Sequence, residues 1–294
     1  MQIRNWNDFR YVLALKRGRS LSGAARLLGV DDTTVSRRLS ALQSATGSEL
    51  YRRQSDGTLL LTANGEAVAC HAEAMEHRAD LIGEVVGSDR NTCSGIVRLT
   101  SVPIVVNRWL APRIGTLLKA HPGLEVELIP DSRDLSLTRR EADLALRLAR
   151  PTTGGSNIKA RRIGYLNYAV YAARELSRGE ADGLPWITYE DAMAHIPQAH
   201  WISRLVKGRN DRLAGIRVHD AETALEAAIA GVGRAVLPSA IAERDGRLHR
   251  LETAGRPAPP SRELWLLAHT DQLELRRIAE VIAWIESVPG AALS

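Results

Sequence analysis

Hydroxyl and guanidinium side chains are concentrated between residues 33 and 38, in the segment TTVSRR. Arg37 and Arg38 carry permanent positive charges with several N–H donors, which suit phosphate oxygens and the acceptor edge of guanine. The hydroxyl groups of Thr33, Thr34 and Ser36 are short donors of the kind that contact phosphates and base edges. If these side chains share one helix face, the chemistry that they support is recognition of double-stranded DNA.

Two helices are predicted here, one that precedes this segment and one that contains it. The first runs through LSGAARLL and ends at Gly29, because glycine adopts the positive φ of a helix terminus at little cost. Asp31 and Asp32 follow, and aspartate side chains there accept hydrogen bonds from the free N–H groups of the next helix. The pattern predicts a helix, a short turn and a second helix.

The second predicted helix has one apolar stripe. Val35, Leu39 and Leu42 recur at spacings of four and three residues, which leaves the hydroxyl and arginine side chains facing outward. This arrangement is typical of a helix-turn-helix whose second helix enters the major groove of DNA. The alternative is an ordinary helical hairpin with solvated arginines.

The charge distribution favours DNA binding. Residues 1–60 contain ten Lys or Arg and five Asp or Glu, whereas the whole chain contains 39 and 34. The formal net charge of +5 therefore resides in the first fifth of the chain. Localised positive charge is what attraction to phosphate requires.

The flanking segments predict the rest of a DNA-binding domain over residues 1–61. Apolar residues Trp6, Phe9, Val12 and Leu13 mark an amphipathic helix that closes at Gly18 and packs behind the helix-turn-helix.

The segment ELYRRQSDGTLLLT predicts two short strands joined by Ser55, Asp56 and Gly57, which form a wing. Arg52 and Arg53 on that wing are expected to reach phosphates or a minor groove. The alternative is that they line a solvated hairpin edge.

A linker helix is predicted over residues 62–90, with Thr62 as its cap and its end near Gly87. Its apolar residues recur at spacings of 4, 3, 4, 3 and 4, the signature of a two-stranded coiled coil. These predicted dimerisation residues are Val68, Ala72, Met75, Ala79, Ile82 and Val86. A dimer would pair two DNA-reading helices across a two-fold axis, whereas the alternative is a helix packed on its own domain.

From Ser94 onward, predicted strands alternate with predicted helices. The strands are GIVRLTS, LEVELIP and DLALRLA, separated by the helices NRWLAPRIGTLLKAH and SLTRREA. A second set contains GYLNYAVYAA, IRVHD, AETALEAAIAG and RAVLP, followed by ELWLLAH and the helix ELRRIAEVIAWIES. The alternation predicts α/β architecture, with a parallel sheet, helices on both faces and two small lobes.

No catalytic constellation is predicted. Gly231 and Gly233 follow a helix and precede a strand, the reverse of the order in a dinucleotide fingerprint. Ser239 lies outside a G-x-S-x-G elbow, and the eight histidines show no metal-ligand spacing. We therefore expect no enzyme activity, no metal site and no cofactor.

We expect a cytoplasmic protein without a membrane span, because the chain has no run of 18 apolar residues and no signal-peptide pattern. The two cysteines, Cys70 and Cys93, lie in different predicted segments and fit a reducing compartment. A redox switch that uses both remains an alternative.

Over nearly its full length the chain resembles the LysR-type transcriptional regulators. In the N-terminal part the resemblance rests on AARLLGV, TVSRRLSALQ, Gly47, Leu50, YRR at 51–53 and Thr62-x-x-Gly65. In the C-terminal part it rests on LAPRI, HPGLEVEL, EADLALR and GVGRAVLP, which occur in the family's order.

The resemblance implies a winged helix-turn-helix, a linker helix and an effector-binding domain over residues 91–294 that is similar to periplasmic solute-binding proteins. We expect lobe I at about 91–162 and 263–294 and lobe II at about 163–262. In this family a small molecule bound between the lobes alters how the DNA-bound dimer or tetramer contacts RNA polymerase.

The chain departs from the family at the start of the recognition helix. Family members often have Ser-Gln-Pro or Ser-Gln-Ser there, where this chain has Asp31, Asp32 and Thr33, and Leu21 replaces the usual aromatic residue. Asp32 is either a helix cap, which we favour, or a reader of cytosine N4.

The family's effector site maps onto three turns of lobe I and two segments of lobe II. The predicted effector-binding residues are Thr100, Ser101, Val102, Pro103, Ser132, Arg147, Ser203, Asp220 and Thr223, with Asp131, Arg133, Trp201 and Ile202 beside them. Ser132 and N–H groups after Ser101 suit a carboxylate, so we expect a small anionic effector. The alternative is that Ser101 only caps a helix and Arg147 pairs with a surface acid.

Two other functions remain open from the sequence. One is a DNA-binding regulator that is independent of an effector or driven by redox chemistry. The other is a small-molecule binding protein whose DNA-binding domain is vestigial.

Overall fold

The computed structural model describes residues 5–54, 58–86, 93–132, 137, 142–151, 157–208, 211–253 and 255–288. It divides into two compact units, Met1–Arg90 and Asn91–Ser294.

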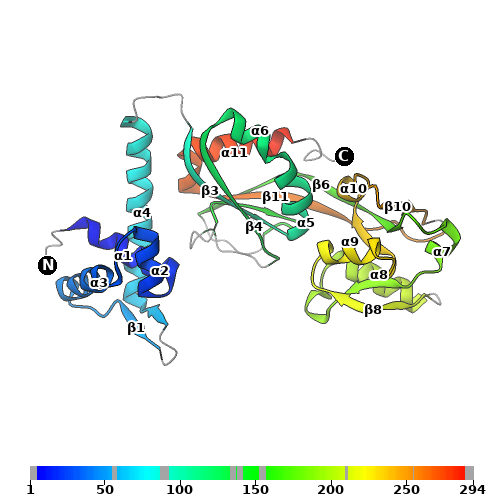
Figure 1. Ribbon diagram of the computed structural model, residues 1–294, viewed down its shortest axis with the longest axis horizontal. Coiled ribbons are helices and arrows are strands. Elements are labelled where there is room, and N and C mark those ends of the chain that lie inside the picture. Colours follow the sequence, from blue (N-terminus) through cyan, green and yellow to red (C-terminus); the bar gives the residue numbers. More distant parts are fainter. Residues whose placement is uncertain are drawn as a thin grey trace. The chain divides into compact units, whose positions relative to one another are not determined.

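The first unit is a helical domain with a small hairpin (Figure 1). Its elements are η1 (Trp6–Asp8), α1 (Phe9–Gly18), α2 (Leu21–Leu28), α3 (Asp32–Thr46), β1 (Tyr51–Arg53), β2 (Leu59–Leu61) and α4 (Ala63–Val86). The helix-turn-helix is α2 and α3, as the spacing predicts, and α1 contacts α2, α3 and α4.

The core of this unit is built by the apolar stripe of α3. Val35, Leu39 and Leu42 are buried together with Val12 and Leu15 of α1. Such a core is stabilised by the removal of apolar surface from water, at about 25 cal/mol per Å².

The prediction for Trp6 is wrong: its side chain is 70% exposed and lies in the short helix η1. The buried face of α1 begins only after Phe9, with Tyr11 and Val12. Trp6 therefore adds nothing to the core.

The hairpin pairs β1 with β2 antiparallel, with Arg52 opposite Leu60. The predicted turn at Ser55, Asp56 and Gly57 lies outside the described residues.

The long helix α4 starts where the sequence predicts. Thr62 Oγ1 accepts a hydrogen bond from Gly65 N at 3.1 Å and donates to Glu49 O at 2.6 Å. A Cβ atom at Gly65 would lie 1.9 Å from Leu50 O, so only glycine allows the helix to start this close to the wing.

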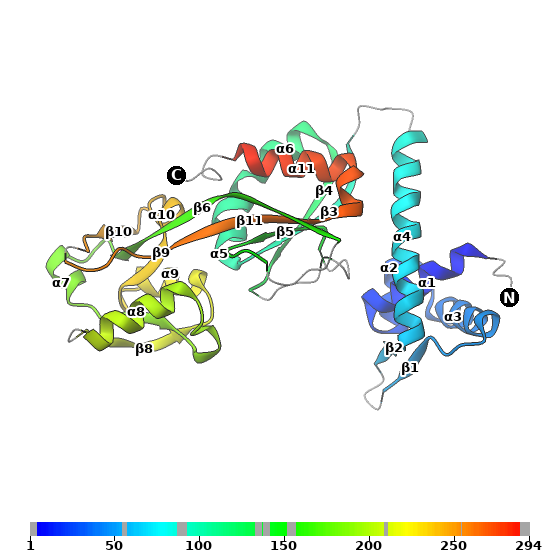
Figure 2. The same cartoon turned by 180° about the vertical axis from the view of Figure 1, so that it is seen from behind.

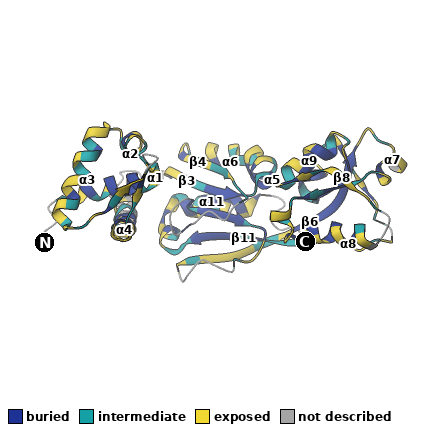
Figure 3. Cartoon of the chain, turned by 90° about the horizontal axis from the view of Figure 1, so that it is seen from below, coloured by how far each residue is buried: buried dark blue, intermediate teal, exposed yellow. Residues whose placement is uncertain are grey.

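The second unit is built on a seven-stranded sheet in the order β10-β6-β11-β5-β3-β4, with β9 paired to β6. The strands are β3 (Ser94–Ser101), β4 (Gly123–Pro130), β5 (Leu144–Arg147), β6 (Ile158–Ala173), β9 (Ala235–Pro238), β10 (Leu248–Leu251) and β11 (Ser261–His269). The helices carry buried residues on one side and exposed residues on the other, whereas strands β5 and β9 are buried almost throughout (Figure 3).

The expectation of a wholly parallel sheet is wrong. Strand β3 runs parallel to β4 and β5, but β11 runs antiparallel to β5 and β6, and β6 runs antiparallel to β9 and β10. The antiparallel pairs arise because the chain crosses from one lobe to the other on β6 and returns on β11.

Strands β6 and β11 lie side by side between the lobes (Figure 2). The first part of β6 pairs with β11, from Ile158 opposite His269 to Asn167 opposite Ser261. Its last part, Tyr168–Tyr171, pairs with β9 in the second lobe. The expected lobe boundaries at 162 and 263 thus fall inside two continuous strands.

In the first lobe the chain turns helical at Pro103, earlier than the predicted start at residue 107. The segments are α5 (Pro103–Val105), the π-helix η2 (Val106–Leu110), η3 (Ala111–Arg113) and α6 (Ile114–Ala120). Proline at the first position of α5 has the φ that a helix start requires. Most of the predicted helix at 136–142 lies outside the described residues.

The second lobe adds a parallel pair of strands, β7 (Trp186–Tyr189) and β8 (Leu213–Val218). Its helices are α7 (Arg178–Asp182), η4 (Asp191–Met193), α8 (Pro197–Gly208), α9 (Ala221–Ile229) and α10 (Ser239–Ala242). After α9, Gly231 takes φ +74°, which fits the predicted helix end and tight turn. The chain then returns to the first lobe, where η5 (Thr270–Glu274) and α11 (Arg276–Ser287) complete it.

Candidate DNA-binding and effector-binding sites

The recognition helix α3 is capped by Asp31. Its carboxylate accepts hydrogen bonds from Thr34 N at 2.6 Å, from Thr34 Oγ1 at 2.9 Å and from Thr33 Oγ1. These bonds, first that of Thr33 and then those of Thr34, lower the pKa of Asp31 to about 2. The hydroxyl groups of both threonines are therefore engaged with Asp31.

The prediction that Asp32 is the cap is wrong, because Asp31 occupies that position. Asp32 is the first residue of α3, and its carboxylate accepts a hydrogen bond from Ser22 Oγ at 2.5 Å. This bond joins α2 to α3 across the turn. Asp32 and Ser22 are both exposed, so the carboxylate stays on the outer surface.

The outer face of α3 presents Thr33 and Arg37 to solvent, with Thr34 and Ser36 half-buried. Arg38 does not face outward as predicted: its guanidinium lies 3.3 Å from Asp8, and its side chain is 38% exposed. The two arginines differ because the helix turns the second one toward η1. Arg37 is thus the arginine of α3 that is open to a ligand such as DNA.

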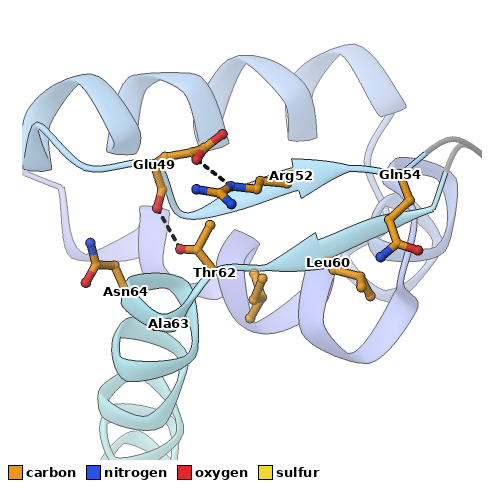
Figure 4. Close-up of a pocket in the computed structure, with 8 residues that line it drawn as sticks. Glu49, Arg52, Gln54, Leu60, Thr62, Ala63 and Asn64 are labelled. Carbon is orange, nitrogen blue, oxygen red and sulfur yellow. Dashed lines mark hydrogen bonds and ion pairs between the residues drawn. The ribbon is translucent and has the colours of Figure 1, made fainter.

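The wing arginines are exposed. Arg52 is held by Glu49, with Nε 2.7 Å from Oε2. The same face of the hairpin borders a hollow of about 520 Å³ that includes Gln54, Leu60 and Asn64 (Figure 4). Arg53 is exposed on the neighbouring position of β1.

Only part of the predicted dimerisation seam on α4 is exposed to solvent. Val68 packs against the core of the first unit and Ala72 is buried there, so these two positions follow the alternative of a helix packed on its own domain. Met75 is half-buried, Ala79 is exposed and Ile82 is 63% exposed. The side chain of Val86 is not among those described.

Ion pairs fasten α4 to α1. Lys16 Nζ lies 3.2 Å from Glu73 and 3.4 Å from Glu66, and Arg17 lies 2.7 Å from Glu76. Because α1 also contacts α3, these pairs connect the orientation of the linker helix to that of the recognition helix.

In the first lobe, the hydroxyl groups of Thr100 and Ser101 form hydrogen bonds with neighbouring strands of the sheet. Both residues are fully buried, and they donate to Ile129 O and Leu146 O at 3.0 Å each. Ser101 does not cap a helix either, since the residue before α5 is Val102. Neither hydroxyl group is exposed here, and their contact with an effector stays a prediction.

The half-buried Val102 and Pro103 form the turn into α5. Asp131 N donates to Ser101 O at 2.9 Å, which brings the segment with the half-buried Ser132 next to the end of β3. Arg147 is half-buried at the end of β5, the strand on the other side of β3. Arg133 lies outside the described residues.

In the second lobe, Asp220 caps α9 by accepting from Thr223 N at 2.8 Å. Thr223 and Ser203 are exposed. Trp201 and Ile202 are buried, and Trp201 Nε1 donates to Ala258 O at 2.9 Å. The indole therefore belongs to the core of this lobe.

A polar cluster that the sequence reasoning missed lies where the crossover strands meet. It consists of Tyr168 on β6, Tyr189 at the end of β7, Gln198 on α8 and Arg262 on β11. Arg262 Nε donates to Leu148 O at 2.9 Å, directly after Arg147.

Burial raises the pKa of Tyr168 to about 12, against hydrogen bonds with Gln198 and Arg262 that lower it. Gln198 Oε1 and Tyr189 Oη are buried and have no hydrogen-bond partner within the described part of the chain. Buried polar atoms are usually paired, so a water or a ligand is expected beside them.

Within the ranges that the structure describes, no group of three His, Cys, Asp or Glu residues is placed to hold a metal ion. No helix in those ranges is long and apolar enough to span a membrane. Cys70 is exposed on α4, and Cys93 is buried before β3.

Two family models match the chain. Residues 6–66 match the bacterial regulatory helix-turn-helix protein, lysR family, and residues 90–289 match the LysR substrate binding domain. The Mau operon transcriptional activator of Paracoccus denitrificans is 30% identical over 270 residues, covering 90% of this chain and 89% of its own. The glycine cleavage system transcriptional activator of Escherichia coli is 26% identical over 290 residues, covering 95% and 92%.

Solved structures share the fold. A full-length variant of OxyR from Pseudomonas aeruginosa has a TM-score of 0.69 at 15% identity, covering 97% of this chain and 98% of its own. Full-length LysG from Corynebacterium glutamicum with bound effector Arg has a TM-score of 0.63 at 18% identity, covering 97% of each chain. With its winged helix-turn-helix and two-lobed domain, the chain belongs to the LysR family of transcriptional regulators.

Proposed function

We propose that this regulator binds operator DNA as a homodimer or homotetramer through α3 and the wing, and that a small anionic molecule bound between the lobes controls it. The observation that carries the effector part is the polar cluster at the crossover, where Arg262 lies with Tyr168, Gln198 and Tyr189. Gln198 Oε1 and Tyr189 Oη are buried there without a hydrogen-bond partner among the described residues.

The DNA part is supported by the outer face of α3. Arg37 and Thr33 are exposed there, and Arg52 and Arg53 are exposed on the wing. Residues 1–60, which include α3 and most of the wing, contain ten Lys or Arg against five Asp or Glu, and this positive charge suits the phosphate backbone. In this proposal Arg37 contacts bases or phosphates, and the wing arginines contact phosphates.

The effector part is supported by charge and by unmet hydrogen bonds. Arg262 Nε donates to Leu148 O, next to the half-buried Arg147 in the chain, so one guanidinium group is anchored just after the end of β5. Guanidinium groups bind carboxylates in a bidentate manner. Gln198 Oε1 is an acceptor without a donor within the described residues, so a ligand that carries an N–H or O–H beside its carboxylate suits it best.

The experiment is a thermal-shift screen of the full chain against carboxylates, amino acids, aromatic acids and phosphorylated metabolites. A ligand at a hundredfold excess over its Kd stabilises the folded state by about 2.7 kcal/mol. A hit that raises the melting temperature of the parent chain but not that of Arg262→Gln supports the proposed site. Failure of every carboxylate contradicts the anionic effector.

Basic amino acids belong in the same screen, because the LysG structure is described with bound effector Arg. A hit confined to basic compounds would contradict an anionic effector and leave the DNA part of the proposal intact. A hit that then changes DNA affinity establishes the regulatory coupling. The contact with RNA polymerase is a separate proposal and is tested by transcription in vitro.

A redox-driven regulator receives less support. Cys93 is only 4% exposed, and exposure favours thiol oxidation. The double variant Cys70→Ser, Cys93→Ser is expected to regulate normally.

A further inference from the structure

One arginine joins the two lobes of the second unit. Arg108 lies on η2 of the first lobe, and its Nε donates to Glu222 Oε1 at 2.7 Å. Its Nη2 donates to Glu226, and its Nη1 lies 3.8 Å from Asp245 Oδ2. All three carboxylates belong to the second lobe, so a single guanidinium holds a cluster of acids across the lobe boundary.

The three acids differ in their dependence on Arg108. Glu226 and Asp245 also contact Arg247 of their own lobe, at 3.4 Å and 2.7 Å. Glu222 is 19% exposed, and its second carboxylate oxygen is buried without a partner in the part of the chain that the structure describes. Loss of Arg108 therefore leaves the charge of Glu222 uncompensated, which is costly for a partly buried carboxylate.

The ion pairs lie on two helical segments, each of which begins at residues that the sequence predicts to bind an effector. The segment that carries Arg108 starts at the turn of Val102 and Pro103. Helix α9, which carries Glu222 and Glu226, starts at its cap Asp220. Helices α5 and α9 also contact each other directly (Figure 1).

We propose that Arg108 is a positioning residue that latches the two lobes in one relative orientation through Glu222 and Glu226. Two packed lobes linked in this way can rearrange as rigid bodies about β6 and β11 when the latch is weakened. A ligand that contacts either helix start then changes the strength of the latch. This last consequence rests on the proposed function, whereas the role of Arg108 in lobe geometry does not.

The test measures the distance between the lobes without any effector or DNA. Spin labels are placed on the exposed residues Lys119 of α6 and Arg204 of α8, in the full chain with both cysteines changed to serine. Labelled chain is mixed with an excess of unlabelled chain, so that double electron–electron resonance reports distances within one chain. Arg108→Gln is then compared with Arg247→Gln.

Arg247→Gln is the matched control, because it removes the same charge from the same cluster but breaks contacts within one lobe only. We expect Arg108→Gln to shift or broaden the distance distribution by about 2 Å or more, because elements at packed interfaces move by such amounts when they rearrange. Arg247→Gln should retain the parent distribution. An unchanged distribution in Arg108→Gln overturns the proposal, as does an equal change in the control.

Glu222→Gln provides a second, milder variant if Arg108→Gln does not fold, and it must shift the distribution in the same direction. Once an effector is known, Arg108→Gln should change its Kd by about fivefold or more. If the distance shifts and no effector binds, the latch stands and the proposed effector control fails.

Discussion

Lys16 on α1 and Glu73 on α4 form an ion pair at 3.2 Å in which the two side chains are only 13% and 7% exposed. Its position matters because α1 also contacts the recognition helix. The pair therefore joins the linker helix to the helix that packs against the recognition helix.

Removal of Lys16 is expected to be strongly destabilising. Lys16→Ala leaves Glu73 buried without its counter-ion, at a cost of about 3 kcal/mol in the free energy of unfolding. Arg17→Ala is the control, because it breaks the more exposed pair with Glu76 and should cost less than about 1 kcal/mol. Urea unfolding followed by circular dichroism measures both, and equal losses would contradict the role of burial.

Arg37 is expected to contribute directly to DNA affinity. Arg37→Ala should weaken operator binding by roughly tenfold or more, since one base or phosphate contact is lost, while the melting temperature stays unchanged. Arg98→Ala, which removes an arginine from β3 of the other unit, is the charge control. Fluorescence anisotropy against salt concentration measures the effect, and an unchanged affinity would remove Arg37 from the interface.

The cap of the recognition helix should fail at acid pH. The pKa of Asp31 is lowered from 3.8 to about 2, so its stabilising effect is complete above pH 3.8 and is lost as the pH falls toward 2. Asp31→Ala should lower the melting temperature at neutral pH by a few degrees, more than Asp32→Ala does, because only Asp31 caps the helix. A larger effect of Asp32→Ala would contradict this assignment.

The half-buried Met75 and the exposed Ile82 of the α4 seam should control oligomerisation. Ile82→Asp and Met75→Asp are expected to dissociate the oligomer in sedimentation velocity, because a charge on an apolar seam opposes coiled-coil packing. Ala72→Asp is expected instead to destabilise the first unit, by about 3 kcal/mol, because Ala72 is buried there. An oligomer that survives Ile82→Asp would contradict the proposed seam.

Local spacing in the sequence was sufficient to predict the helices and the hairpin of the DNA-binding unit. The stripe of Val35, Leu39 and Leu42, the helix end at Gly29 and the cap at Thr62 all depend on neighbours within about one helical turn. The strands and helices predicted for the second unit differ from the observed ones by only a few residues at most ends, but β7, α7, α8 and β10 had no predicted counterpart. Short-range patterns predict such elements because burial and capping act over those distances.

Only the tertiary structure decided the partners of the polar side chains. Arg38 turns to Asp8, thirty residues away, and Ser101 donates to a strand carbonyl. The antiparallel crossover of β6 and β11 brings Tyr168 and Arg262 together, nearly a hundred residues apart.

The latch of Arg108 on Glu222 spans 114 residues in the same way. Nothing in the spacing of these residues signals such contacts, because their geometry depends on how the chain crosses between the lobes. The sequence by itself therefore determined the family and the elements, whereas the folded chain decided which charges are free and which are paired.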